Sequence, residues 1–294
     1  MEQLLITGGT GLIGRHLIEK IHKQYDITVI SRDPARAKRL LGKDLKIISI
    51  DEVTQVDAYD GIINLAGEPI ADKRWNTLQK EEIIDSRLNI TTRLRDLINN
   101  AKTKPKVFIS GSAIGVYGRQ GDTPINEDFK DYHKEFSSDL CSQWEQIALT
   151  ANTRVCITRT GIVLDEDGGA LAKMLMPFRL GLGGPIADGT QFMSWIHIED
   201  LANLFLYVIE YNLQGVYNGV APNPVKQGEM VKAIAKTINR PIILPKVPSF
   251  MLKLLLGDMS AVVLESQRVS SQKVENLGFQ FKYHHLQPAL EDLF

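Results

Sequence analysis

The stretch QLLITGGTGLIGRHLIEKIHK, residues 3–23, decides the fold expected for this chain. Its opening residues, Gln3–Ile6, form an apolar run that predicts a strand, and Gly11–Lys23 has the spacing of an amphipathic helix. The glycine-rich segment Thr7–Gly14 joins the two, and a second apolar strand is expected at Ile27–Ile30. A loop of this kind, between a strand and a helix, binds the pyrophosphate of a dinucleotide.

Three glycines of this loop have distinct expected roles. Gly8 allows the tight turn, Gly11 lets the backbone approach a pyrophosphate, and Gly14 lets the helix lie close to the strand. The first turn of the helix then offers unpaired N–H groups and its positive dipole end to the phosphate charge. We therefore predict that Thr7–Gly14 holds the phosphates of a nucleotide.

Apolar runs alternate with helical patterns through residue 160, which predicts a parallel sheet covered by helices on both faces. The expected strands are Gln3–Ile6, Ile27–Ile30, Leu45–Ile50, Gly61–Leu65, Val107–Ser110 and Val155–Arg159. The expected helices are Gly11–Lys23, Pro34–Leu41, Lys80–Ala101 and Ser137–Leu149. The predicted fold class is therefore α/β, a doubly wound parallel sheet of the Rossmann type.

The pattern loosens after Thr160. The elements expected there are helices at Asp200–Tyr211 and Gly228–Ile238, a strand at Gly215–Asn218, and a loop over residues 168–185. From Pro245 onward we expect a compact tail with its own helix and a strand-like run at Gly278–Tyr283. The predicted organisation is a nucleotide-binding domain over residues 1–220 and a small α+β cap over residues 245–294, packed on the carboxyl edge of the sheet.

The composition narrows the range of partners and compartments. Lys plus Arg is 34 and Asp plus Glu is 35 in 294 residues, a net charge of −1, so we expect no nucleic-acid partner. No apolar stretch reaches the roughly 20 residues of a membrane span, and no basic leader precedes the first strand. Cys141 and Cys156 lack metal-ligand spacing, which predicts buried thiols in a reducing cytoplasm and no metal site.

The end of the second predicted strand bears on the choice of coenzyme, and it reads Ser31–Arg32–Asp33. A carboxylate at this edge holds the ribose 2′-hydroxyl of NAD, whereas a guanidinium forms a charge-assisted pair with the 2′-phosphate of NADP. Arg32 therefore favours NADP(H), and Arg36 lies near enough to help. Asp33 keeps NAD open if the turn is shifted by one residue.

Several motifs resemble the extended branch of the short-chain dehydrogenase/reductase superfamily, which contains sugar-nucleotide epimerases and dehydratases. They are the TGxxGxxG spacing of residues 7–14, the NLAG of 64–67, the SGSA of 110–113 and the VYG of 116–118. Further matches at residues 85–87, 91–93, 194–198, 266–268 and 278–279 narrow the resemblance to the "epimerase family protein" subgroup, which carries the same small C-terminal domain.

The resemblance implies a set of coenzyme-binding residues. They are Thr7, Gly8, Gly9, Thr10, Gly11, Leu12, Ile13, Gly14, Ser31, Arg32, Asn64, Leu65, Ala66, Gly67, Arg87 and Ser110. Arg87 is open to a second reading, in which it pairs with Glu68 rather than with a phosphate.

The resemblance also implies a Tyr and a Lys four residues later on one helix, with a Ser that orients the substrate oxygen. None of the eight tyrosines has a Lys at that spacing. Aligning the helix on Trp144–Glu145 places Ser137 and Cys141 where the Tyr and Lys are expected, whereas the Ser is retained as Ser112. This departure removes the residue pair on which the usual epimerase or dehydratase chemistry depends, and it leaves the coenzyme-binding motifs unchanged.

Other side chains are candidates for the missing proton transfer. Ser112, Tyr117 and His197 are the predicted catalytic residues, and the competing readings are a pocket wall for Tyr117 and a helix cap for His197. Glu68, Lys173 and Trp195 are predicted to lie on the substrate side.

Two functions remain open from the sequence. The first is an NADP(H)-dependent oxidoreductase or epimerase-like enzyme, whose small-molecule substrate lies between the sheet edge and segments 166–190 and 245–294. The second is a non-catalytic NADP(H)-binding sensor, and a purely structural role is a weaker third. A homodimer that pairs helices 80–101 and 137–149 is also expected.

Overall fold

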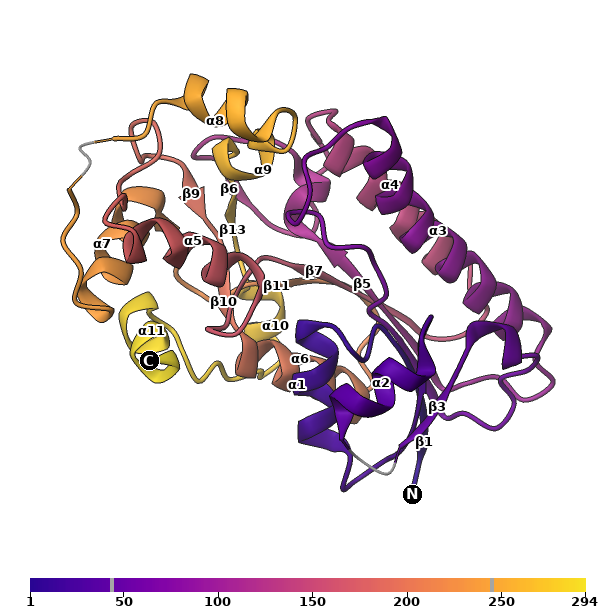
Figure 1. Cartoon of the computed structure of the whole chain (residues 1–294). Coiled ribbons are helices and arrows are strands. Elements are labelled where there is room, and N and C mark those ends of the chain that lie inside the picture. The colour runs from indigo at the N-terminus through magenta and orange to yellow at the C-terminus, as the bar shows by residue number, and fades with distance from the viewer. Residues whose placement is uncertain (43–44, 244–245) are drawn as a thin grey trace.

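The computed structural model describes residues 1–42, 45–243 and 246–294 (Figure 1), so the predicted first residue of the cap, Pro245, lies outside them. Its centre is a seven-stranded sheet in the order β3-β2-β1-β4-β5-β7-β11, with every neighbouring pair parallel. The strands are β1 (Gln3–Thr7), β2 (Asp26–Ile30), β3 (Lys46–Ile48), β4 (Gly61–Asn64), β5 (Val107–Ala113), β7 (Val155–Thr160) and β11 (Gly215–Gly219). The predicted doubly wound sheet is confirmed, and its strand order reverses between β1 and β4, where such sheets bind ligands.

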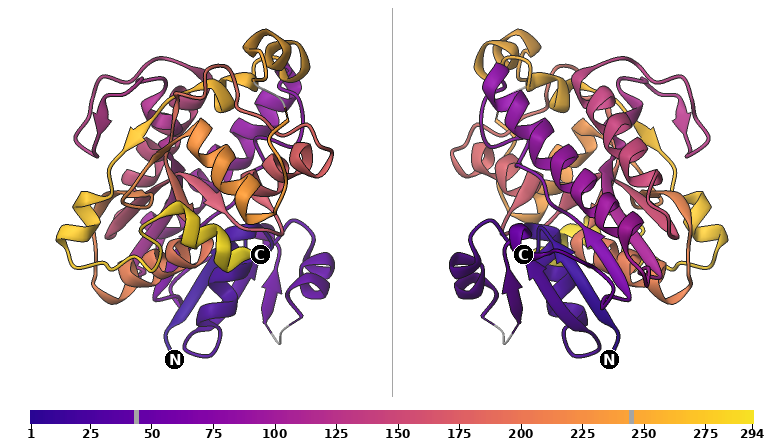
Figure 2. Two further views of the ribbon diagram at one scale, coloured as in Figure 1. Left: turned by 90° about the vertical axis from the view of Figure 1, so that its left-hand side faces the viewer. Right: turned by 90° about the vertical axis from the view of Figure 1, so that its right-hand side faces the viewer.

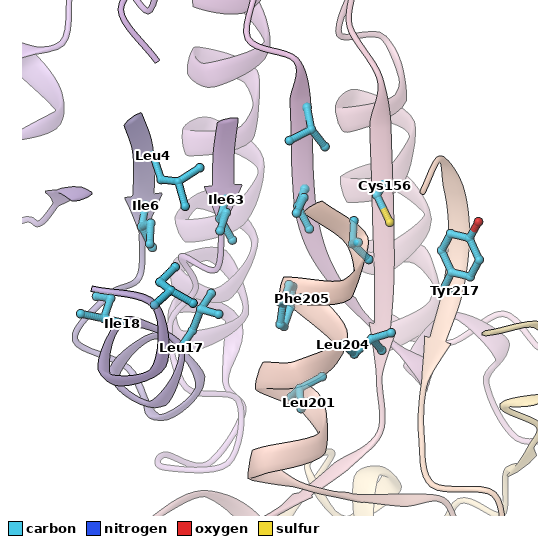
Figure 3. Packing of buried hydrophobic residues seen from close by; sticks show 14 of the residues in the cluster. Leu4, Ile6, Leu17, Ile18, Ile63, Cys156, Leu201, Leu204, Phe205 and Tyr217 are labelled. Carbon is cyan, nitrogen blue, oxygen red and sulfur yellow. The ribbon is translucent and has the colours of Figure 1, made fainter. Parts of the chain in front are cut away.

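Helices cover both faces of the sheet because the strands are apolar on both sides. The helices are α1 (Leu12–Ile21), α2 (Pro34–Leu41) and α6 (Ile198–Glu210) on one face, and α3 (Thr77–Asn100) and α4 (Phe136–Leu149) on the other. Leu4 and Ile6 of β1 pack with Phe205 of α6, whereas Leu5 packs with Leu94 of α3, since successive side chains of a strand point to opposite faces. Figure 3 shows the first of these two clusters, and Figure 2 shows α3 and α4 side by side on the opposite face.

Shorter elements build the region beyond the carboxyl ends of the strands. Three small pairs are β8 (Ile162–Leu164) with β10 (Trp195–His197), β9 (Phe192–Met193) with β12 (Val225–Lys226), and β6 (Pro124–Ile125) with β13 (Arg268–Val269). The remaining elements are the 3₁₀ turns η1 (Ile50–Glu52) and η2 (Ile114–Tyr117) and the helices α5 (Gly169–Arg179), α7 (Gln227–Thr237), α8 (Ser249–Leu256), α9 (Ser260–Leu264), α10 (Gln272–Asn276) and α11 (Leu286–Leu293). None of the described helices is long and apolar enough to cross a bilayer.

The predicted loop over residues 168–185 contains a helix, α5, that the sequence reading missed. Leu171, Leu175 and Phe178 are buried at helical spacing against α7 and α11. Pro177 lies in the last turn, where it interrupts the backbone hydrogen-bond pattern of only the helix end. The flanking glycines and this proline mask the periodic signal.

The C-terminal segment packs into the hydrophobic clusters of the main body. Val274, Phe279 and Phe281 join the cluster around α1 and α6, and Leu290 joins the cluster under α5 and α7. The predicted strand-like run at Gly278–Tyr283 is wrong, since no strand forms there. The N–H groups of Lys282 and Tyr283 donate instead to the buried Asp200 carboxylate, at 2.7 and 3.0 Å.

Candidate functional site

The glycine-rich loop is packed so tightly that side chains are excluded at two positions. Gly8 has a φ of +70°, and a Cβ there would lie 2.3 Å from the carbonyl oxygen of Leu65. A Cβ on Gly14 would lie 2.3 Å from the carbonyl oxygen of Gly8. The loop backbone therefore packs directly against the residue after β4 and against the first turn of α1. Such close packing is expected of a turn whose backbone binds a pyrophosphate.

The first turn of α1 is free to receive an anion. Gly11 is its N-cap residue, and no described side chain caps this end of the helix. Leu12 contacts the region of Gly168 and Gly169, where an added Cβ would lie 3.2 and 3.0 Å from its methyl groups. The segment that opens α5 therefore lies beside the helix end, and the predicted contact of Gly11 with a pyrophosphate has an open helix terminus to serve it.

Buried polar side chains hold the ends of β1 and β4 together beneath the loop. The Thr7 hydroxyl donates to Asn64 Oδ1 at 2.6 Å, and Asn64 Nδ2 donates to the Thr91 hydroxyl at 2.8 Å. The N–H of Ala66 reaches the Thr7 oxygen at 3.3 Å. Thr7 and Asn64 are 2% and 0% exposed, so they position the loop backbone. Ser110 is also fully buried, and its hydroxyl donates to the carbonyl of Gly111 at 3.2 Å.

At the end of β2, where the coenzyme ribose is expected, the Arg32 side chain is exposed and the Asp33 carboxylate is already hydrogen-bonded. The Arg32 side chain is 85% exposed, and its guanidinium lies 3.5 Å from Glu68. Asp33 caps α2, where Oδ1 accepts the Arg36 N–H at 2.9 Å. Its N–H donates to the Ser31 hydroxyl at 3.2 Å. The Asp33 carboxylate, which would bind the ribose 2′-hydroxyl of NAD, is therefore already engaged as the cap of α2.

Arg87 lies under the loop that follows β4. Its Nη1 donates to the carbonyl of Ile83 at 3.1 Å, and its guanidinium lies 5.5 Å from the ring of Trp144. A Cβ on Gly67 would lie 2.8 Å from the guanidinium carbon, so Gly67 is the position that makes room for it. Burial lowers the pKa of Arg87, although the nearby Cys141 and Glu68 act in the opposite direction. Its charge is thus held close to the crevice beyond the carboxyl ends of β1 and β4, where an anionic group would stabilise it.

A cavity of about 660 Å³ lies between the start of α4 and helices α8 and α9. Figure 1 shows α8 and α9 beyond the carboxyl ends of the strands. Trp75 and Phe136 supply aromatic walls, with ring centroids 5.0 Å apart. Its charged lining residues are Lys80, Arg119, Glu135, Lys253, Asp258 and Glu265. The size and the mixture of apolar and charged groups suit a small polar molecule.

The position where the resemblance implies a Tyr opens onto this cavity. Ser137 lines it, one turn before Cys141 on α4. Cys141 is buried, and burial together with the nearby Glu145 raises the pKa of its thiol to about 11. A thiol of that acidity is not a nucleophile near neutral pH. The prediction of a buried, structural Cys141 agrees with this environment, as does the buried Cys156.

Ser112 belongs to a buried charge network. Its hydroxyl donates to Glu145 Oε1 at 2.6 Å. Arg159 pairs with the same carboxylate through Nε at 2.9 Å and Nη2 at 2.8 Å. Ser112, Glu145 and Arg159 are 5%, 6% and 4% exposed. The hydroxyl predicted to orient a substrate oxygen therefore orients a structural carboxylate.

Tyr117 is the second predicted catalytic residue in this network. Its hydroxyl donates to Asn218 Oδ1 at 2.7 Å and accepts from Arg159 Nη1 at 3.0 Å. The ring is fully buried, and burial, opposed by Arg159, raises the pKa of the phenol to about 12. This geometry matches the wall reading of Tyr117 and gives its hydroxyl no route to a ligand.

The sequence analysis did not identify Arg159, the centre of this network, as a functional or structural residue, although its position in the strand could have indicated it. Arg159 stands in the otherwise apolar strand sequence VCIT, where a buried cation requires a carboxylate partner. The Tyr132 hydroxyl completes the set at 3.1 Å from Nη2.

His197 caps α6, so the competing reading made from the sequence describes its position. Its Nδ1 accepts the N–H of Glu199 at 3.1 Å, and its ring lies against Tyr283 at 4.0 Å. Burial lowers the pKa of His197. The prediction that it transfers a proton in the cavity has no geometric support, because its ring faces Asp292 at 3.6 Å, and neither residue lines the cavity.

The same cluster is the one place among the described residues where metal-ligand atoms gather. Ligand atoms of His197, Glu199 and Asp292 lie within 4.8 Å of one another. Since Nδ1 accepts the cap hydrogen bond, the neutral ring carries its proton on Nε2, which leaves no lone pair for an ion. Lys282 further neutralises Glu199 at 2.6 Å. The donor set therefore does not fit a metal.

The three predicted substrate-side residues lie in different environments. Trp195 is fully buried and donates to the carbonyl of Asn223 at 3.0 Å, so it is a core residue, and it does not line the cavity. Lys173 on α5 reaches across to the loop after β4, where it donates to the carbonyl of Ala71 and to Asp72 Oδ1. Its charge therefore joins the two segments that flank the crevice. Glu68, between Arg32 and Lys73, lies at the same edge.

The fold and this crevice define the class of protein: a doubly wound nucleotide-binding α/β protein of the extended short-chain dehydrogenase/reductase type. The family profile described as "NAD dependent epimerase/dehydratase family" matches residues 4–219, and the "Domain of unknown function (DUF1731)" matches residues 247–293. The chain belongs to the NAD dependent epimerase/dehydratase family, as the sequence motifs implied.

Named relatives cover the chain almost completely. It is 40% identical to "Epimerase family protein SDR39U1 homolog, chloroplastic" of Arabidopsis thaliana, over 97% of this chain and 84% of the relative. It is 36% identical to "Epimerase family protein SH2119" of Staphylococcus haemolyticus, over 100% and 99% of the two chains. The crystal structure of human epimerase family protein SDR39U1 (isoform2) with NADPH is similar with a TM-score of 0.91, at 33% identity over 99% of this chain and 98% of that one.

Proposed function

We propose that this protein binds NADP(H) and acts on a small molecule as an oxidoreductase or epimerase-like enzyme. Two observations together carry the choice of coenzyme: the Arg32 side chain is exposed, and the Asp33 carboxylate is already engaged in the α2 cap. The human relative crystallised with NADPH supports it. When bound, the coenzyme supplies or accepts a hydride at its nicotinamide ring.

The residues of this chain fit the coenzyme in three places. Gly8 and Gly14 allow the loop backbone to approach the pyrophosphate, and the open end of α1 complements its charge. Arg32 would give up its ion pair with Glu68 and pair with the 2′-phosphate instead. Arg87, held against Gly67 after β4, would place its positive charge beside the coenzyme, and the cavity would hold the substrate.

Substituting Arg32 tests the choice of coenzyme. In Arg32→Ala the loss of a charged hydrogen bond is expected to weaken NADPH binding by about 1–3 kcal/mol and to leave NADH binding nearly unchanged. Fluorescence titration with both reduced coenzymes measures this. Arg39→Ala removes the same charge from the exposed face of α2 and is the matched control. Equal weakening of NADPH and NADH in Arg32→Ala would contradict the assignment.

The second candidate is a non-catalytic NADP(H)-binding sensor. The network that engages Ser112 and Tyr117 favours it, because those hydroxyls serve the fold rather than a substrate. Purified protein with NADPH and a panel of sugar nucleotides, quinones and small carbonyls separates the two. Coenzyme oxidation that depends on an added substrate supports the enzyme, and tight NADPH binding without oxidation across the panel supports the sensor.

Three further expectations belong to the same proposal. The family-specific cap would comprise residues 245–294 and the coenzyme domain residues 1–220. The protein would work in the cytoplasm, where two free, buried thiols stay reduced. A homodimer would pair α3 and α4 with their copies, and light scattering measures its mass.

A further inference from the structure

Two carboxyl groups, those of Glu135 and Glu265, line the cavity. Glu135 is the N-cap residue of α4, and Glu265 follows the last turn of α9. Each group shifts the pKa of the other, which indicates that the two carboxyls lie close enough to interact and to share one proton. Both residues line the cavity together with Ser137.

The surroundings assign the charge to Glu135. Its Oε1 lies 3.0 Å from His133 Nδ1, 3.2 Å from the backbone N of Arg119 and 3.8 Å from Arg119 Nε. Burial acts to raise the pKa of Glu135, but the hydrogen bonds from Glu265 and Arg119 and the nearby positive charges lower it overall. Glu135 is therefore the carboxylate of the pair.

The same surroundings assign the proton to Glu265. It is 9% exposed, and its buried Oε1 accepts no hydrogen bond from any described residue. Burial first, and then the bond and charge of Glu135, raise the pKa of Glu265 to about 8. Arg119 opposes this shift, and the remaining charges of the cavity, Lys80, Lys253 and Asp258, come from other elements of its wall. A protonated acid thus faces the cavity at neutral pH.

We propose that the Glu265 carboxyl, held against Glu135 in the cavity wall, is the group that exchanges a proton with an oxygen atom of the bound substrate. The proposal rests on the proposed function. Ser137 stands where the resemblance implies the Tyr that would donate the proton, and Glu265 would donate it instead. A ligand in the cavity could contact Glu265, because Glu265 and Ser137 line the same cavity.

The proton and electron balance is simple in the reducing direction. A substrate carbonyl would take a hydride at carbon, which the NADPH of the proposed function would supply, and a proton at oxygen from Glu265. The O–H bonding pair stays on Glu265 as a carboxylate. Water in the open cavity then returns the proton, with Glu135 and Arg119 holding the carboxyl in place.

A diazoacetamide reads this proton transfer without knowledge of the substrate. A diazo compound esterifies a carboxylic acid only in its protonated form: the acid proton moves to the diazo carbon, the carboxylate oxygen bonds to that carbon, and N₂ leaves. Peptide mass spectrometry of the full chain at pH 7 is expected to find the ester on Glu265 at least tenfold faster than on Asp258. Asp258 lines the same cavity, but its hydrogen bond and ion pair with Lys80 lower its pKa, which makes it the matched control.

The pH dependence decides whether the labelled group is the one proposed. Labelling of Glu265 should fall about tenfold per pH unit above its pKa of about 8 and should vanish in Glu265→Gln. Labelling that falls away above pH 5, like that of a surface carboxyl, overturns the proposal. NADPH binding, measured on the same samples, tests the proposed function separately.

Thermal stability gives a second readout. The pKa of Glu265 is raised above its usual 4.5, so its stabilising contribution is complete below about pH 4.5 and is lost as the pH rises through about 8. Glu265→Gln, which mimics the protonated acid, should melt with the wild type at pH 5 and above it at pH 9. A variant less stable than wild type at pH 9 contradicts the assigned proton. For any carbonyl that the wild type reduces, an unchanged kcat in Glu265→Gln also overturns the proposal, which expects a fall of at least 100-fold.

Discussion

Replacing Arg159 with Met is expected to lower the free energy of unfolding by about 3–5 kcal/mol. The guanidinium makes both hydrogen bonds to Glu145 and reaches two tyrosine hydroxyls, all within the protein interior. Without it, Glu145 remains a buried carboxylate that keeps only the Ser112 hydroxyl. Since folded domains are stable by about 5–15 kcal/mol, such a loss removes a large share of the total. Urea unfolding followed by tryptophan fluorescence measures it.

Two comparison variants identify the cause. Arg154, just before β7, is partly exposed and bonds the carbonyls of Val208 and Leu213, so Arg154→Met should lower stability by only about 1 kcal/mol. Adding Glu145→Gln to Arg159→Met removes the orphaned charge, and the double variant should be more stable than Arg159→Met alone. Additive effects of the two substitutions would show that the pair is not coupled.

Gly14→Ala is expected to destabilise the fold by about 2–3 kcal/mol and to weaken NADPH binding at least tenfold. The new Cβ would lie 2.3 Å from the carbonyl oxygen of Gly8 and 2.7 Å from Gly9 Cα, so the first turn of α1 has to move away from the loop. Alanine otherwise stabilises a helix interior by about 1 kcal/mol relative to glycine, so any destabilisation reports the collision. Thermal melts and coenzyme titration measure the two effects.

The neighbouring Gly11 and Arg15 separate packing from binding. Gly11→Ala places its Cβ 3.2 Å from the Gly8 oxygen, without a strained φ, and should mainly weaken the coenzyme. Arg15→Ala, on the exposed face of α1, should leave both quantities near the wild type. A Gly14→Ala protein that melts and binds like Arg15→Ala would contradict the packing described for the loop.

Local sequence was sufficient for the elements that local patterns control. The loop at Thr7–Gly14, helix α2 at Pro34–Leu41 and the parallel sheet followed from glycine spacing and from apolar runs of strand length. The replacement of the expected Tyr and Lys by Ser137 and Cys141 was also readable, because a fixed spacing on one helix defines that pair.

The remaining features depend on partners that are distant in the chain. The Tyr117 hydroxyl is engaged by Asn218, 101 residues away, and the cavity brings Glu135 at the N-cap of α4 together with Glu265 of the C-terminal segment. Spacing along one chain does not reveal such encounters. Trp195 illustrates the difficulty, since its motif resembles a site segment while its ring is fully buried in a core cluster.

The way residues 274–290 interlock with the rest of the molecule has a consequence for synthesis. Val274, Phe279 and Phe281 complete the cluster that contains α1, and the N–H groups of Lys282 and Tyr283 satisfy the buried Asp200 carboxylate. The ribosome makes these residues long after the sheet that they close. A nascent chain that has emerged only through β11 therefore still exposes apolar core and an unsatisfied acid, and it remains prone to aggregation until residues 274–290 have emerged as well.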